Sequence, residues 1–134
     1  MKRPFLLLTL VALSFTTPGC VLAVGAAAGT GYLISREVRD EYHTARVARD
    51  SDTTWSVVVE SLEILQDVGT ELALDPSRQR ATAKIEGAEV RVSVEAYDLD
   101  STIVRITAEK LLVDAPGTAE RVLNYTLDRI EETD

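Results

Sequence analysis

Apolar residues recur at helical intervals in two parts of this chain. Over residues 53–67 they fall three and four positions apart, on one side of a predicted helix: Trp55, Val58, Val59, Leu62 and Leu65. The preceding Asp50-Ser51-Asp52 offers oxygens that can cap the first amides, and Gly69 suits the position just past the helix end. A second helix is predicted from Pro116–Thr118 to about Glu132, with an apolar side of Ala119, Val122, Leu123, Leu127 and Ile130.

Elsewhere beyond residue 34 the pattern changes to alternation, which predicts β-strands. The most regular strand is Ala88–Tyr97, in which every second residue is Val or Ala. Further strands are predicted at Thr70–Asp75, Gln79–Glu86, Thr102–Leu112 and, with less regular alternation, residues 35–47. Glu86-Gly87 suits a tight hairpin turn. The alternation indicates a sheet with one buried face and one face in water.

Two amphipathic helices and a one-faced antiparallel sheet can bury their apolar surfaces against each other. We therefore predict an α+β two-layer sandwich with both helices on one face of the sheet, in the order β-α-β-β-β-β-α. This single domain is expected to span residues 35–134, a length that is sufficient for one hydrophobic core.

The first twenty residues differ in kind from the rest. Met1-Lys2-Arg3 is a short basic end, Phe5–Leu13 is a nearly unbroken apolar run, and Ser14–Gly19 consists mostly of small and turn-forming residues before Cys20. This layout is typical of a secretory signal peptide. The apolar run is too short for a full membrane span, which needs about 20 residues.

Thr17-Pro18-Gly19-Cys20 resembles the lipobox of bacterial lipoproteins, in which small residues precede an obligatory cysteine. Gly19 and Cys20 match that motif, whereas Thr17 and Pro18 depart from it. The resemblance implies that residues 1–19 are removed as a signal peptide, that a diacylglyceryl group alkylates the Cys20 thiol, and that the new amino terminus is acylated. Several acyl chains would hold the protein firmly in a membrane. The alternative is an ordinary signal peptide or an uncleaved anchor, with an incidental cysteine.

The residue after Cys20 is Val21 rather than Asp. In lipoproteins of diderm bacteria this difference implies sorting to the outer membrane, so the resemblance places the protein in the cell envelope, facing the periplasm. Residues 20–34 then join the lipid to the domain through an uncharged, Gly- and Ala-rich stretch, which is expected to act as a tether. In a second interpretation, Gly25 and Gly29 form a GxxxG face through which a membrane-associated oligomer assembles.

Composition narrows the choice of partners. The chain has 14 basic and 22 acidic side chains, and removal of residues 1–19 takes away Lys2 and Arg3, for a net charge of about −10. Such a surface repels phosphate backbones, so we expect no nucleic-acid partner. The single cysteine excludes an internal disulfide, and the chain contains no CxxC motif and no Cys/His cluster.

No group of residues has both the types and the spacing of a catalytic site, so we expect no enzyme activity and no cofactor. His43 is the only histidine, and its polar neighbours predict a solvated strand face. The pairs Asp50/Asp52 and Asp98/Asp100 could contribute to a calcium site, but a helix cap and a hairpin turn explain them better. We therefore predict no metal site.

The function that these observations favour is a lipid-anchored structural or interaction module of the cell envelope, with another envelope protein or a cell-wall polymer as its partner. A binding surface would be the polar side of the sheet, although an ordinary solvated face has the same composition. The candidate residues on that side are Arg91, Glu95, Tyr97, Arg105, Thr107 and Glu109.

The layout of the chain supports the same location. Cys20-Val21 through Gly31, followed by a compact α+β domain, is similar to a family of small bacterial lipoproteins that share a domain of unknown function. The resemblance covers roughly residues 18–131. It implies an envelope location and this fold, and it carries over no catalytic residues.

Overall fold

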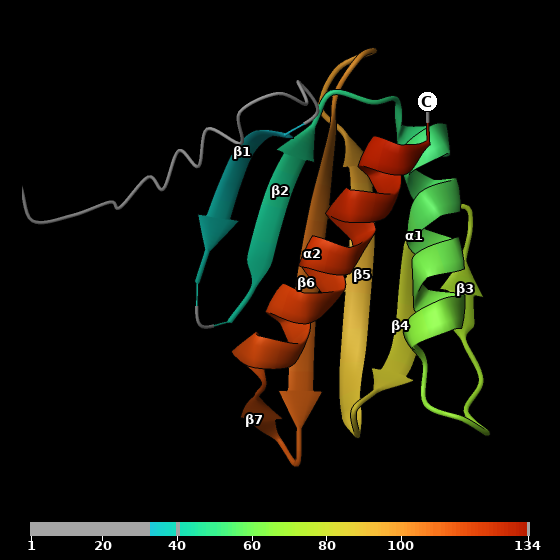
Figure 1. Ribbon diagram of the computed structural model, residues 1–134, viewed down its shortest axis with the longest axis vertical. Coiled ribbons are helices and arrows are strands. Elements are labelled where there is room, and N and C mark those ends of the chain that lie inside the picture. The colour runs from blue at the N-terminus through green and yellow to red at the C-terminus, as the bar shows by residue number, and fades with distance from the viewer. Residues whose placement is uncertain (1–32, 40, 134) are drawn as a thin grey trace, which may run out of the picture.

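The computed structural model describes residues 33–39 and 41–133. In this part of the chain two helices pack on one face of a seven-stranded antiparallel sheet, as Figure 1 shows. The predicted α+β fold class is therefore confirmed. The elements are β1 (Leu33–Val38), β2 (His43–Val47), α1 (Ser51–Leu65), β3 (Ala73–Asp75), β4 (Arg80–Ile85), β5 (Ala88–Ala96), β6 (Thr102–Lys110), β7 (Val113–Asp114) and α2 (Pro116–Glu132). The strands lie in the order β1-β2-β6-β5-β4-β3, and β7 pairs with β6.

The hydrophobic core lies between the helices and the covered face of the sheet. Alternate residues of β5 and β6 point into it, among them Val90, Val92, Val104 and Ile106, and all of them are buried. Leu62 of α1 and Leu123 of α2 complete the same cluster from the helical layer. The alternation in the sequence therefore marks the two faces of the central strands correctly.

Helix α1 starts where the sequence offers a cap. Asp50 is the N-cap, and its carboxylate accepts a hydrogen bond from the backbone N–H of Thr53 at 2.8 Å. The buried side of the helix includes two hydroxyl residues, Thr54 and Ser61, whose side chains donate to carbonyl groups one turn earlier. Because these hydroxyls find partners within their own helix, they can face the core without an unpaired polar group.

The end of α1 differs from the prediction. The helix stops at Leu65, two residues before the predicted end, because Asp67 bonds to the β4–β5 hairpin. The backbone N–H of Asp67 donates to the carbonyl of Lys84 at 2.7 Å, and its carboxylate accepts from the N–H groups of Glu86 and Gly87. Gly69, with φ +80°, lies in the loop that follows and does not cap the helix.

Residues 35–47 form a hairpin of two strands, where the sequence predicted one. The turn between β1 and β2 contains neither Gly nor Pro, and the backbone N–H of Arg39 donates to the carbonyl of Tyr42 at 2.8 Å. The reversal of the chain between β1 and β2 explains the irregular alternation over residues 35–47. Strand β1 forms one edge of the sheet, and β2 lies between β1 and β6.

The prediction that His43 lies on a solvated strand face is wrong. The side chain is only 2% exposed, on the covered face of the sheet, where β2 alternates between buried and half-buried residues. Neither ring nitrogen has a hydrogen-bond partner among the described residues. Burial lowers the pKa of His43, the positive charge of Arg36 lowers it further, and the negative charge of Glu120 opposes them.

Two strands are also shorter than predicted. Strand β3 covers only Ala73–Asp75, because the backbone N–H of Thr70 turns back to the carbonyl of Asp67. Strand β6 ends at Lys110, and the next two residues, Leu111 and Leu112, adopt positive φ angles of 51° and 62° in the turn to β7. This turn was not predicted, since leucine rarely takes such a conformation.

Candidate interaction surface on the open face of the sheet

The open face is the side of the sheet opposite the helices. It carries all six of the predicted candidates: Arg91, Glu95, Tyr97, Arg105, Thr107 and Glu109. Strand register brings Arg91 directly opposite Thr107, whereas Glu95 lies opposite Ile103. Four of the six side chains are exposed, and those of Thr107 and Glu109 are half-buried.

Strand β2 adds residues to this face that sequence reasoning missed. The guanidinium of Arg46 stacks on the ring of Tyr97, 3.6 Å from its centroid. The same guanidinium donates to the hydroxyl of Ser101 at 3.1 Å and to a carboxylate oxygen of Asp98 at 3.2 Å. These contacts join residues about fifty positions apart, and only the pairing of β2 with β6 reveals them.

A second tyrosine lies between two arginines near the β1–β2 turn. The guanidinium carbon of Arg105 is 5.2 Å from the ring centroid of Tyr42, and that of Arg39 is 5.6 Å from the same ring. An arginine that stacks on an aromatic ring keeps its planar face covered and its N–H groups directed outward. The open face therefore presents two ordered Arg–Tyr groups, although the protein as a whole is acidic.

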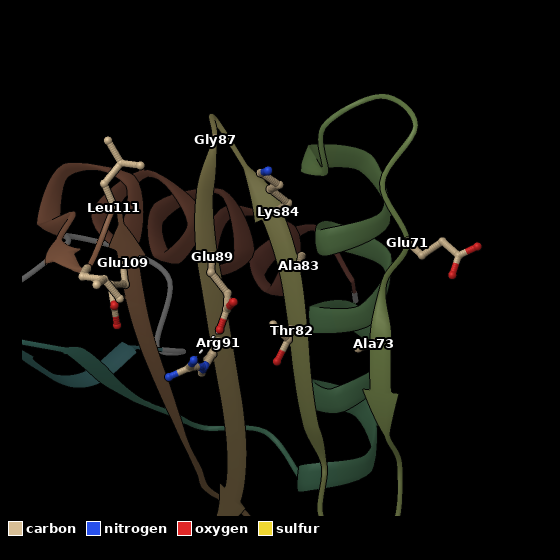
Figure 2. Close-up of a pocket in the computed structure, with 11 residues that line it drawn as sticks. Glu71, Ala73, Thr82, Ala83, Lys84, Gly87, Glu89, Arg91, Glu109 and Leu111 are labelled. Atoms are coloured by element: carbon tan, nitrogen blue, oxygen red, sulfur yellow. Dashed lines mark hydrogen bonds and ion pairs between the residues drawn. The ribbon is translucent and has the colours of Figure 1, made fainter.

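A hollow of about 500 Å³ lies toward the end of this face formed by the β4–β5 and β6–β7 turns. Lys84, Glu89 and Arg91 line it from neighbouring strands, and Glu71 points outward, away from them, in Figure 2. Arg91 contacts Glu89 through a charged hydrogen bond. Glu89 and Glu109 are direct cross-strand partners, so this arginine offsets part of their mutual repulsion. The mixture of charges suits weak polar binding.

One carboxylate of each acidic pair has a structural role. Asp50 caps α1, and its hydrogen bonds from the backbone and side chain of Thr53 lower its pKa. Asp98 accepts from the backbone N–H of Asp100 in the β5–β6 turn, and its pKa is lowered mainly by a hydrogen bond from the Ser101 side chain. Across residues 33–39 and 41–133, no cluster of three His, Cys, Asp or Glu side chains could hold a metal ion.

The predicted lipid-attachment site lies outside the described residues. This applies to Cys20, to Thr17 and Pro18 before it, and to Gly25 and Gly29 of the alternative oligomerisation motif. Neither helix of the described domain is long and apolar enough to cross a membrane.

No protein-family model and no curated protein matches this sequence. Among solved structures, the domain is similar to the di-domain ARO/CYC protein StfQ from the steffimycin biosynthetic pathway, with a TM-score of 0.52 and 14% sequence identity. The match covers 68% of this chain and 43% of StfQ, so this chain spans less than half of that protein. At this identity the similarity concerns the fold alone.

Proposed function

We propose that this protein is a lipid-anchored interaction module of the cell envelope, without enzyme activity. In this proposal Cys20 carries the lipid, residues 20–34 form the tether, and the open face of the sheet contacts an envelope protein or a cell-wall polymer. The observation that carries the interaction role is the open face itself: no described element covers it, and it presents two Arg–Tyr groups.

The chemistry of these groups supports binding. Tyrosine and arginine are enriched at the centres of protein interfaces, because each offers a large contact area together with hydrogen bonds. Arg46 is held in place by Asp98, Ser101 and the ring of Tyr97, so little side-chain entropy is lost when a partner contacts it. Arginine also recognises carboxylates, which both protein and cell-wall partners can supply.

The lipid anchor can be tested by intact-mass analysis of the membrane-extracted full chain beside the Cys20→Ala variant. We expect the wild type to lack residues 1–19 and to carry the mass of a diacylglyceryl group and a further acyl chain. The variant should carry no lipid and should leave the membrane fraction. A wild-type chain without lipid would refute the anchor, and with it the proposed location.

The interaction surface can be tested separately in cells with a photo-crosslinking residue. We expect adducts when this residue replaces Thr107 on the open face, and none when it replaces Glu63 on the exposed side of α1. A control combines the Thr107 probe with the Arg46→Ala substitution, which should reduce the amount of adduct. Equal adducts from both positions, or adducts from the helix alone, would contradict an interaction role for the open face.

A further inference from the structure

Exposed apolar side chains gather at the end of the sheet where the chain enters the domain. Leu99, in the β5–β6 turn, is 92% exposed, and Ile34, near the start of β1, is 45% exposed. Figure 1 shows the β5–β6 turn and the beginning of β1 at the same end of the sheet. We call this the proximal end, defined by Ile34, Ala48 and the turn residues 97–101.

All of these residues except Tyr97 line one hollow of about 430 Å³. Its apolar side is formed by Ile34, Ala48 and Leu99, and its polar side by Arg46, Asp98, Asp100 and Ser101. Arg46 donates to both Asp98 and Ser101, so most of the polar groups of the hollow already pair with one another. An apolar surface could therefore approach Leu99 and Ile34 without stranding the charge of Arg46.

The proximal end also resembles the parts of proteins that lie at a lipid–water boundary. Tyrosine and arginine have apolar bodies and polar tips, and they suit the level of the lipid headgroups. Here the guanidinium of Arg46 stacks on the ring of Tyr97, and Arg46 lines the hollow together with the exposed Leu99. The exposed Asp100 favours headgroups without net charge over anionic ones.

A second exposed apolar group lies at the opposite end of the domain. Leu111 and Leu112 are 90% and 91% exposed in the β6–β7 turn, and Figure 1 shows this turn at the far end of β6. The nine residues of β6 separate the two ends by about 30 Å, at roughly 3.3 Å per residue. The point of chain entry distinguishes these two ends. Leu33 follows Cys20 by 13 residues, and a random coil of that length spans about 20 Å on average, less than the ~30 Å between the ends.

We infer that the proximal end rests on the lipid surface that holds Cys20, and that the Leu111–Leu112 turn points away from it. This inference rests on the proposed lipid attachment. It assigns Leu99 and Ile34 to the top of the acyl-chain region. Arg46 and Tyr97 then lie level with the headgroups, at the membrane-proximal edge of the open face, where a partner on the same membrane can contact them. The open face of the sheet then stands upright on the membrane and is accessible from the side.

The test uses the full lipidated chain in phosphatidylcholine vesicles, with an environment-sensitive fluorophore on a single introduced thiol. Acylated Cys20 has no free thiol, so Leu99→Cys supplies the reactive one, and Leu111→Cys is the matched control because both side chains are almost fully exposed. A nitroxide placed near the top of the lipid acyl chains should quench the label at position 99. The label at position 111 should keep its fluorescence.

The outcomes separate the orientation from the anchor. Intact mass of the same samples reports whether Cys20 carries lipid, and its absence overturns both proposals. A lipidated chain with an unquenched label at position 99 overturns the orientation alone, and so does equal or stronger quenching at position 111. Quenching at position 99 only, on a chain whose circular dichroism matches the wild type, supports the orientation.

Discussion

The two faces of β5 and β6 are formed by alternate residues of the same two strands but differ in what they contribute. On the covered face, Val92 and Ile106 are opposite one another and are fully enclosed by the helices. On the open face, Ser93 lies opposite Arg105, and neither side chain is covered by another described element. Burial of apolar area on one face supplies most of the stability. The other face is therefore free to vary for recognition, at little cost to the fold.

The largest expected effect is a difference in the free energy of unfolding between substitutions of two neighbouring residues, one on each face. Ile106→Ala should lower the free energy of unfolding by about 2–5 kcal/mol, because it leaves a cavity in the core. Arg105→Ala, one residue away, should change it by about 0.5 kcal/mol or less. Urea denaturation followed by circular dichroism measures both. Similar losses in the two variants would show that the open face is not energetically independent.

His43 tests whether a buried polar side chain on the covered face lowers the free energy of unfolding. The pKa of His43 is lowered in the folded state, so as the pH falls the unfolded chain binds a proton before the folded chain does. The free energy of unfolding is therefore highest above about pH 6.5 and declines as the pH falls through that value. His43→Leu should abolish this decline. It should also leave stability at higher pH unchanged or raised by about 1 kcal/mol, because two unpartnered nitrogens are removed.

Denaturation midpoints between about pH 8 and pH 5 measure the difference between wild type and His43→Leu. Glu86 and Asp98 do not obscure it, because their pKa values are lowered and their contributions are lost only at more acid pH. The decline in the wild type should level off below the folded-state pKa of His43. The same slope in both proteins would show that another group controls this pH range.

The helical layer that covers one face depends on its caps. Asp50→Ala should cost about 1 kcal/mol, because the N–H and hydroxyl of Thr53 lose their acceptor. Asp50→Asn keeps a side-chain oxygen and should retain most of that stability. Thermal denaturation of the three proteins provides the measurement. A cost in the Asn variant equal to that in the Ala variant would assign the effect to charge rather than to capping.

A small effect is also expected from the Arg46–Tyr97 group of the open face. Arg46→Ala should cost about 0.5–1 kcal/mol, since it removes a stacked ring contact and a partly exposed ion pair with Asp98. Raising the salt concentration should reduce only the ion-pair part of this cost. Urea titrations at low and high salt can separate the two. A loss above about 2 kcal/mol would make Arg46 part of the stabilising framework instead of the recognition surface.

The sequence predicted most of the fold because its strongest patterns are local. The regular alternation of β5 and β6 and the helical stripe of α2 placed these elements to within a few residues. The Glu86-Gly87 turn was predicted because glycine permits the positive φ of 76° found there. In each of these segments, local preference and the final packing agree.

The features that the sequence did not predict depend on contacts between distant segments. Residues 39–42 contain neither Gly nor Pro, so the first hairpin was interpreted as one strand and His43 was assigned to the wrong face. The contact between Arg46 and Tyr97 depends on the β2–β6 register, which alternation alone does not specify. The prediction could identify the polar side of the sheet but not its ordered Arg–Tyr groups.

The position of β1 has a mechanical consequence. A pull on the chain ahead of Leu33 would act along β1 and load its hydrogen bonds to β2 in shear, so that many must fail together. Arg36 reinforces this edge strand, because its guanidinium donates to Asn124 at 2.8 Å and lies 3.8 Å from the carboxylate of Glu120, both on α2. A domain tethered at this point would resist tension better than one whose first strand could peel away bond by bond.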